Sequence, residues 1–310
     1  MFRLGGFSDC MLKVPRSASR TAINLPRVIF LTGKGGTGKS SLAKALAIAL
    51  ARRYGVTLVH IGTRNKTATG QSESPQNENA SGIDERILTP RGELETFIEG
   101  IVPVKAIARR MLQSRTFGFV TAALPGLEAF LIMDRLRRMA LDARPDELIV
   151  VDGPATGGAL EMLLVAEGVA AIAPFGTLHR LAGEVELFLH EPGLFGVLLT
   201  LRPEELATRE ALDAAKALQG SGIQNLGAVL NGVTEALFSA ADMEQLQRLP
   251  EHLRLAQERR DQADASAEIA RKLKRARLHT IVAPAIYQTR LQQADFEKLA
   301  DALALGLGMR

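Results

Sequence analysis

From Arg27 onward, short apolar segments alternate with longer amphipathic ones. Six of the apolar segments are nearly free of polar residues and are predicted strands: 28–32, 56–61, 147–152, 195–201, 226–231 and 278–283. Continuous hydrophobicity indicates strands buried on both faces, as in a parallel sheet with crossover helices. The sequence therefore predicts an α/β fold with a doubly wound, mostly parallel sheet, followed by a last helix over 292–305.

The interval between the second and third predicted strands is too long for a single crossover helix. Residues 66–85 are rich in Ser, Asn, Gln and Gly, a composition typical of a mobile loop. Apolar residues then recur at helical spacing over 94–101, 104–112 and 127–141. We expect a helical insertion at 86–143, lying above the carboxyl edge of the sheet.

Two further segments differ from the rest of the chain. Residues 234–277 are highly charged and intermittently apolar, which predicts exposed helices between the last two strands. Residues 1–26 are basic, with Asp9 as their only acid, and have no periodic pattern. They are predicted to be a disordered N-terminal extension, with an organelle-targeting peptide as the alternative. The folded domain is expected to cover 27–310.

Composition narrows the class of protein. No apolar stretch approaches the roughly 18 residues that a spanning helix needs, so we expect a cytoplasmic protein without a transmembrane segment. The single cysteine, Cys10, excludes a disulfide framework and a cysteine-built metal site. The net charge of +4 is spread along the chain, and its densest run, 271–277, is typical of a solvated helix face. Nucleic acid is therefore not an expected partner.

A glycine-rich segment, GKGGTGKSS, follows the first predicted strand and matches G-x-x-x-x-G-K-[ST]. Glycines let successive backbone amides turn inward around phosphates, and the following helix presents its amino end to their charge. Lys39 is expected to reach the β- and γ-phosphates, and the Ser40 hydroxyl to bind Mg²⁺. ATP and Mg²⁺ are thus the predicted ligands. The predicted nucleotide contacts are Gly33, Lys34, Gly35, Gly36, Thr37, Gly38, Lys39, Ser40 and Ser41.

An acid ends the third predicted strand, at the position where this class of site holds a metal-bound water. Asp152 comes directly after the apolar run 148–151. With Ser40 it forms the predicted metal site. An acid that caps the next helix is the alternative interpretation.

Lys34 directly follows the first glycine of the loop, where ordinary phosphate loops need no lysine. The loop resembles the deviant Walker A sequence of the septum-site, partition, nitrogenase-iron and arsenical-pump ATPases. In that family this lysine crosses a dimer interface, so the resemblance implies that Lys34 contacts the nucleotide of the facing subunit. An exposed lysine without this role is the alternative. Lys34, Lys39 and Asp152 are the predicted catalytic residues.

Other segments resemble the arsenical-pump and tail-anchored-protein-targeting ATPases within that class. They are DGPATGGAL (152–160), HEPGLFGVLLTLRPEEL (190–206) and TAALPGLEAFLIMDRLRRM (121–139), the last resembling the bacterial branch. Gly158 stands where the family's second switch has a histidine. The resemblance implies that Asn231 recognises adenine and that Pro284, in the segment 282–284, packs on the base. An Asn-Gly turn is the alternative for Asn231.

The resemblance fails at the first switch. The family has Ser-Thr-Asp-Pro-Ala-His there, whereas this chain has IGTRNKTATG, with Arg64 in place of the aspartate that positions the attacking water. Loss of this acid predicts a hydrolysis-impaired subunit of a homodimer, or of a heterodimer with an intact paralogous ATPase. Arsenite sensing and zinc-clamped dimers need thiolates, which one cysteine cannot supply.

Three function hypotheses follow. The first is an ATP-dependent dimeric switch whose insertion offers an apolar surface to a hydrophobic-helix client. The second is a partition or septum-positioning ATPase, against which stand the insertion and the lack of a basic amphipathic C-terminal helix. The third is a nucleotide sensor without turnover. The candidate client-surface residues, for which a buried core is the alternative, are Leu94, Phe97, Ile101, Ile107, Met111, Leu112, Phe117, Phe119, Leu131 and Met133.

Overall fold

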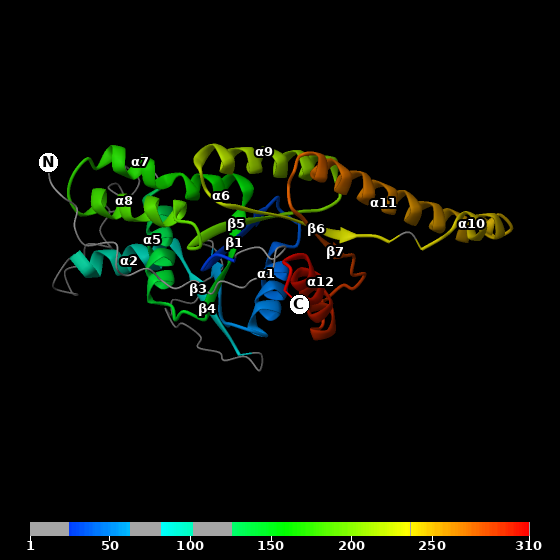
Figure 1. Ribbon diagram of the computed structural model, residues 1–310, viewed down its shortest axis with the longest axis horizontal. Coiled ribbons are helices and arrows are strands. Elements are labelled where there is room, and N and C mark those ends of the chain that lie inside the picture. The colour runs from blue at the N-terminus through cyan, green and yellow to red at the C-terminus, as the bar shows by residue number, and fades with distance from the viewer. Residues whose placement is uncertain (1–24, 63–81, 102–125, 236, 310) are drawn as a thin grey trace.

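The computed structural model describes residues 25–62, 82–101, 126–235 and 237–309, arranged around one sheet (Figure 1). Seven strands lie in the order β3-β2-β4-β1-β5-β6-β7, and every neighbouring pair is parallel. The predicted α/β, doubly wound parallel fold is confirmed. The strands are β1 (Val28–Gly33), β2 (Gly55–Ile61), β3 (Ile83–Leu88), β4 (Glu147–Ala155), β5 (Phe195–Leu201), β6 (Asn225–Val233) and β7 (Thr280–Pro284).

Helices cover both faces of the sheet because successive strand residues point to opposite sides. Ile29 and Leu31 of β1 belong to a core with α1 (Lys39–Ala51) and α12 (Gln293–Gly306). Phe30 belongs to the core of the other face. The helices of that second face include α5 (Leu127–Asp142), α6 (Thr156–Leu163), α7 (Val165–Ile172), α8 (Thr177–His190) and α9 (Glu205–Ser221).

Strand β3 is an element that the sequence analysis missed. The predicted polar loop was expected to extend through Glu85, but β3 starts at Ile83 and pairs with β2 from Val56↔Ile83 to Ile61↔Leu88. Its sequence, IDERIL, carries three charged residues, and only its first and last residues are buried, as an edge strand allows. The insertion is therefore not entirely helical.

Within the described residues of the insertion, the helices α2 (Pro90–Ile101) and α5 agree with the predicted periodicity. They pack against each other. The predicted helix over 104–112 lies outside the described residues.

Helix α5 is part of the main core, and this changes the interpretation of the candidate client surface. Leu131 and Met133 are 1% and 0% exposed, and Leu94 of α2 is 6% exposed. A crossover helix must bury the stripe that faces the sheet, and here α2 and α8 cover more of α5. These three residues are therefore core, which confirms the alternative interpretation and excludes them from a client surface in this structure. Phe97 is half-buried against the same core. The other candidates concern side chains that the structure does not describe: Ile101, Ile107, Met111, Leu112, Phe117 and Phe119.

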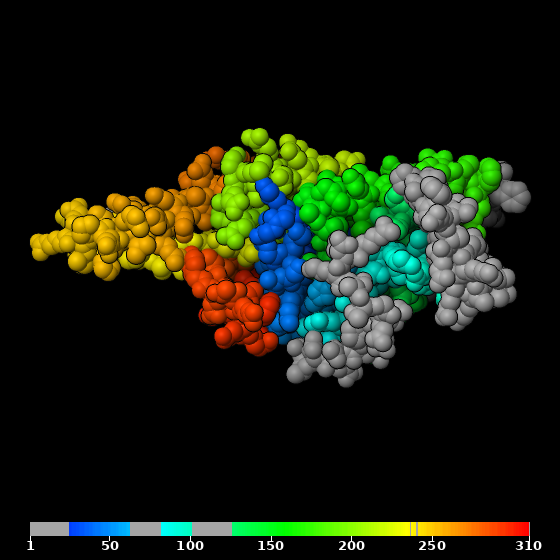
Figure 2. Space-filling model, turned by 180° about the vertical axis from the view of Figure 1, so that it is seen from behind, coloured from blue at the N-terminus to red at the C-terminus, as the bar shows by residue number. Residues whose placement is uncertain are grey.

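The charged segment before β7 forms an arm that projects from the body (Figures 1 and 2). It consists of α10 (Ala240–Leu246) and α11 (Pro250–Arg275), which confirms the predicted exposed helices. At its base, Lys272 lies 2.5 Å from Glu205 of α9. Within the described part of the chain, no helix is long and apolar enough to cross a membrane. Residues 1–24 of the predicted extension lie outside that part.

Candidate functional site

The predicted glycine-rich loop connects the central strand to the helix beside it. β1 ends at Gly33 and α1 begins at Lys39. Gly36 and Gly38 have φ of 82° and 85°, in the left-handed region that glycine adopts without strain. The loop closes on itself because the Thr37 hydroxyl donates to the Lys34 carbonyl at 2.8 Å. This strand, loop and helix arrangement is the one that the motif predicted.

The first and last glycines allow neighbouring strands to approach the loop closely. A Cβ on Gly33 would collide with the backbone of Thr200 on β5, and one on Gly38 would lie 2.5 Å from Asn231 Nδ2. By contrast, a Cβ on Gly35 or Gly36 would have no neighbour within 4 Å, and both residues are exposed. The loop is thus packed against β5 and β6 at its two ends and exposed at Gly35 and Gly36, which fits a cradle for a phosphate chain.

Lys39 lies across this cradle. Its Nζ donates to the carbonyls of Gly33 at 3.0 Å and Lys34 at 3.1 Å. Desolvation lowers the pKa of Lys39, and the nearby negative charge of Asp152 opposes that shift. The ammonium is therefore partly desolvated and electrostatically coupled to the acid that was predicted to hold the metal.

Asp152 lies near the carboxyl end of β4, the strand beside β1, with 13% of its side chain exposed. His60 Nδ1 of β2 lies 3.2 Å from Asp152 Oδ2. Ser40 is exposed in the first turn of α1, and Ser41, which follows it, is half-buried.

These residues fit Mg²⁺ bound through phosphates and water. Among the described residues, no group of three His, Cys, Asp or Glu side chains could hold a metal alone. A hydroxyl from Ser40, a carboxylate from Asp152 and a phosphate cradle are instead the oxygen donors that Mg²⁺ prefers.

Asn231 lies on β6 beside the loop. Its Nδ2 donates to the Thr37 carbonyl at 2.8 Å, so β6 and the loop are joined directly. Pro284 ends the adjacent strand β7 and pairs with Val233, two residues beyond Asn231. The two predicted base contacts thus come together at one edge of the cradle. Their role toward adenine stays a prediction.

Lys34 turns toward its own chain in this structure. Its Nζ lies 3.5 Å from Glu210 Oε1 on α9, and the two side chains are 32% and 38% exposed. The predicted contact across a dimer interface is not tested by a single chain.

The two predicted switches differ in how far the structure describes them. Asp152 to Ala155 extend β4, and Gly158, exposed, lies in the first turn of α6. A Cβ on Gly153 would lie 2.6 Å from the Leu31 carbonyl, so the second switch begins tightly packed on β1. Arg64 of the first switch lies outside the described residues.

Two residues of the site were not predicted from the sequence. Thr200 Oγ1 lies 3.0 Å from Thr37 Oγ1, and both side chains are buried. His60 is directly opposite Asp152 in the pairing of β2 with β4. Each is a polar residue near the end of a predicted apolar strand, but their proximity to the loop depends on the strand order, which periodicity does not give.

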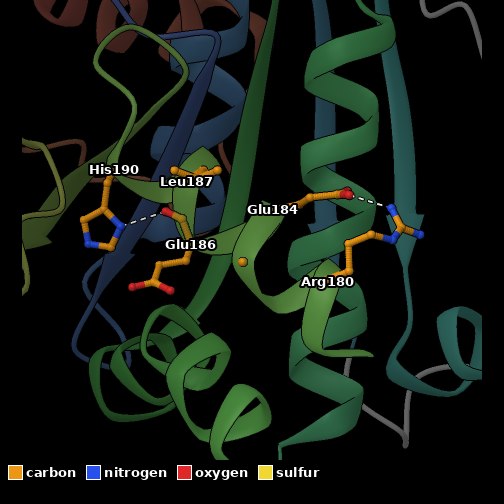
Figure 3. A pocket seen from close by; sticks show the side chains of 6 residues that line it. Arg180, Glu184, Glu186, Leu187 and His190 are labelled. Carbon is orange, nitrogen blue, oxygen red and sulfur yellow. Dashed lines mark hydrogen bonds and ion pairs between the residues drawn. The ribbon is translucent and has the colours of Figure 1, made fainter. Parts of the chain in front are cut away.

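A separate cavity of about 680 Å³ lies along α8 (Figure 3). Two contacts join residues that line it: Arg180 lies 2.6 Å from Glu184, and His190 Nδ1 lies 2.7 Å from the Glu186 carbonyl. The residues that line it are Arg180, Gly183, Glu184, Glu186, Leu187 and His190. The cavity contains none of the predicted nucleotide contacts.

A glycine loop between a central strand and a helix, at the carboxyl edge of a parallel sheet, defines a P-loop nucleotide-binding protein. Residues 28–279 match the family described as the CobQ/CobB/MinD/ParA nucleotide binding domain. The chain belongs to this family and to the P-loop ATPase class that includes it. ATP is accordingly the nucleotide that the family implies.

Individual proteins similar to this chain have a low sequence identity to it. ATPase BagA of Mycobacterium tuberculosis is 28% identical over 214 residues, which cover 62% of this chain and 61% of that protein. The arsenical pump-driving ATPase of Escherichia coli is 24% identical over 248 residues, covering 71% of this chain and 41% of that one. The chain thus spans about three fifths of the length of its mycobacterial relative.

Proposed function

We propose that the chain is a nucleotide-dependent dimeric switch of the arsenical-pump and tail-anchored-protein-targeting type, which binds ATP with Mg²⁺. The observation that carries this proposal is the cradle itself, with Lys39 across it and Asp152 beside it. Lys34 in the loop and the similarity to the arsenical pump-driving ATPase support the choice of this branch.

Phosphate binding would exploit interactions that the loop already makes. The open side of Gly35 and Gly36 leaves room for phosphate oxygens against the backbone amides. Lys39 would exchange two neutral carbonyl acceptors for negatively charged phosphate oxygens, which attract the ammonium more strongly. The partial desolvation of its ammonium is offset by that exchange.

Ser40 and Asp152 would hold Mg²⁺, which when bound neutralises charge on the β- and γ-phosphates. Ser40 contributes a hydroxyl at the amino end of α1, and Asp152 contributes a carboxylate from the neighbouring strand. Asn231 and Pro284 would contact adenine from β6 and β7. Asn231 would then serve both the loop, through its bond to Thr37, and the base.

Lys34 is available for a facing subunit at small cost. Its ion pair with Glu210 is about one third exposed, and pairs of this kind contribute about 0–1 kcal/mol. In the dimer, Lys34 would leave Glu210 and offset charge on the partner's nucleotide. Arg64 in the first switch supports impaired hydrolysis by the lone chain, with turnover restored by an intact paralogue.

Phosphate release from ATP tests whether the chain needs an intact paralogous subunit for hydrolysis. The purified chain would be assayed alone and mixed with a paralogous ATPase whose first switch is intact. We expect little release by the chain alone and stimulation in the mixture that Lys34→Ala removes. Lys44→Ala, also a lysine change near the loop, is the matched control. Robust hydrolysis by the lone chain would overturn the impaired-subunit proposal.

The match to a family that includes MinD and ParA supports a second candidate, a spatial organiser acting on DNA or a membrane surface. A DNA-binding titration at increasing salt separates the two candidates. Binding through phosphates weakens steeply with salt, and its absence at low salt would exclude the DNA-binding form. Crosslinking to a membrane-anchor peptide would support the client-binding switch instead.

A further inference from the structure

His60 is a polar residue in a strand that is otherwise largely apolar. Strand β2 reads GVTLVHI, and its residues 56–59 are buried. In the pairing of β2 with β4, His60 is directly opposite Asp152. The two side chains are in contact, because His60 Nδ1 lies 3.2 Å from Asp152 Oδ2.

This contact occupies one of the two carboxylate oxygens of Asp152. An ionised carboxylate only accepts hydrogen bonds, so Nδ1 of His60 is the donor. The Asp152 side chain is 13% exposed and that of His60 is 33% exposed, so the bond is largely shielded from water. That leaves the second oxygen, Oδ1, for a ligand.

Without His60, Asp152 would have another attractive partner. The charge of Asp152 already acts on the Lys39 ammonium, raising its pKa against the effect of desolvation. A carboxylate free to rotate could pair with that ammonium, and both groups would then be withdrawn from the nucleotide. A hydrogen bond from β2 opposes this rotation.

We infer that His60 is a positioning residue that holds the Asp152 carboxylate in the orientation needed for the metal of a nucleotide complex. The inference rests on the proposed function, because it gives Asp152 a metal to hold. His60 itself touches neither nucleotide nor metal in this account. It acts through the 3.2 Å contact between Nδ1 and Oδ2.

A purely structural role for His60 is the competing explanation, and the chain offers a matched control. Thr57, on the same strand, donates to Glu147 Oε1 on β4 at 3.1 Å. Thr57→Val removes a side-chain contact between the same two strands at their other end. If a loss of metal affinity reflects only weaker strand pairing, it should appear equally in this variant.

The test measures metal affinity rather than turnover. Mn²⁺ would be titrated into the full chain with ADP, and the free ion followed by electron paramagnetic resonance. ADP binding in excess EDTA would be measured alongside. We expect His60→Leu to weaken Mn²⁺ binding by about 10-fold, a typical effect of losing an outer-shell partner of a metal ligand. Metal-free ADP binding should be unchanged.

A variant that restores a hydrogen-bond donor at residue 60 distinguishes orientation of the Asp152 carboxylate from packing of the strand. His60→Asn places an amide donor near the position of Nδ1, so we expect Mn²⁺ affinity within about 3-fold of the original chain. Thr57→Val should leave Mn²⁺ affinity unchanged. If His60→Leu does not fold, His60→Gln moves the donor outward without removing it, and we expect a loss of several-fold.

Three outcomes would overturn the inference: unchanged Mn²⁺ affinity in a folded His60→Leu or His60→Gln chain, an equal loss in Thr57→Val, or no rescue by His60→Asn. They differ from failure of the proposed function. If the unaltered chain bound no ADP with or without Mn²⁺, the nucleotide switch itself would be refuted. If it bound both and His60→Leu behaved identically, only the positioning role would fail.

Discussion

The loop between β1 and α1 contacts residues of two other strands, whereas most side chains of the α10–α11 arm face away from the body. In the loop, Gly33 lies against Thr200 of β5, and Asn231 of β6 donates to Thr37. In the arm, Leu249 and Leu255 are 50% and 56% exposed. Substitutions at the loop positions that contact these strands should therefore be costly, whereas substitutions of exposed residues in the arm should be tolerated.

The largest expected loss of stability comes from adding a side-chain atom where β5 packs against the loop. Gly33→Ala places a methyl group against the Thr200 backbone, which cannot move without disturbing the central sheet. Overpacking of this kind costs about 3 kcal/mol in the free energy of unfolding. Gly35→Ala is the control, because its methyl group meets nothing within 4 Å. Equal urea midpoints for the two variants would contradict the packing described for the loop.

The next largest effect is on ligand affinity and separates function from stability. Lys39→Ala should weaken ATP binding by about 100-fold, roughly 2.7 kcal/mol, because a desolvated charge-assisted contact to phosphate is lost. The fold should stay intact, since Lys39 bonds only to loop carbonyls. Fluorescent-nucleotide titration and thermal melting measure the two effects.

Lys44→Ala on the same helix is the matched variant for that comparison. Lys44 stacks on the Phe296 ring with its Nζ 5.1 Å from the centroid, so this change should affect stability by about 0.5–1 kcal/mol and not binding. Retained ATP affinity in Lys39→Ala would contradict the assignment of this loop as the phosphate site.

A smaller effect is expected where the arm joins the body. Arg259 of α11 lies over the Tyr287 ring, 3.9 Å from its centroid, and Tyr287 also bonds to Thr234. Arg259→Ala should lower the free energy of unfolding by about 0.5–1 kcal/mol. The adjacent, exposed Arg260→Ala should have almost no effect in the same urea titration. A loss above 3 kcal/mol in Arg259→Ala would mean that the arm is as tightly integrated as the loop.

The smallest effect is expected on the exposed surface of the arm. Leu255→Ser should change the free energy of unfolding by less than about 0.5 kcal/mol, as surface substitutions usually do. Its elution volume on gel filtration should also be unchanged if the chain is monomeric without nucleotide. A large loss of stability, or a shift in elution, would indicate that a partner or a second copy covers this residue.

Local pattern was sufficient for much of the fold. Five of the six predicted strands agree with the observed ones within two residues at each end. The sixth, β4, continues three residues further than predicted, to Ala155. Strand β3 was missed because its charged residues at an edge imitate a polar loop, and burial of the α5 stripe could not be distinguished from a client surface without knowing its neighbours.

In the candidate site, too, some residues were predicted from local sequence and others were not. The glycines, Lys39 and Asp152 follow from a contiguous motif and from a strand end, and the structure brings them together. Thr200 and His60 could not be identified, since their proximity to the loop depends on which strands flank β1 and β4. Periodicity predicts that strands exist, but their order in the sheet is set by tertiary packing.

Calorimetry on the folded chain tests whether the loop between β1 and α1 binds ATP. ATP would be titrated with Mg²⁺ present. We expect saturable heat with one ATP per chain and a loss of affinity when Mg²⁺ is removed. No heat and no displacement of a fluorescent nucleotide by ATP or GTP would contradict the claim that this loop holds a nucleotide.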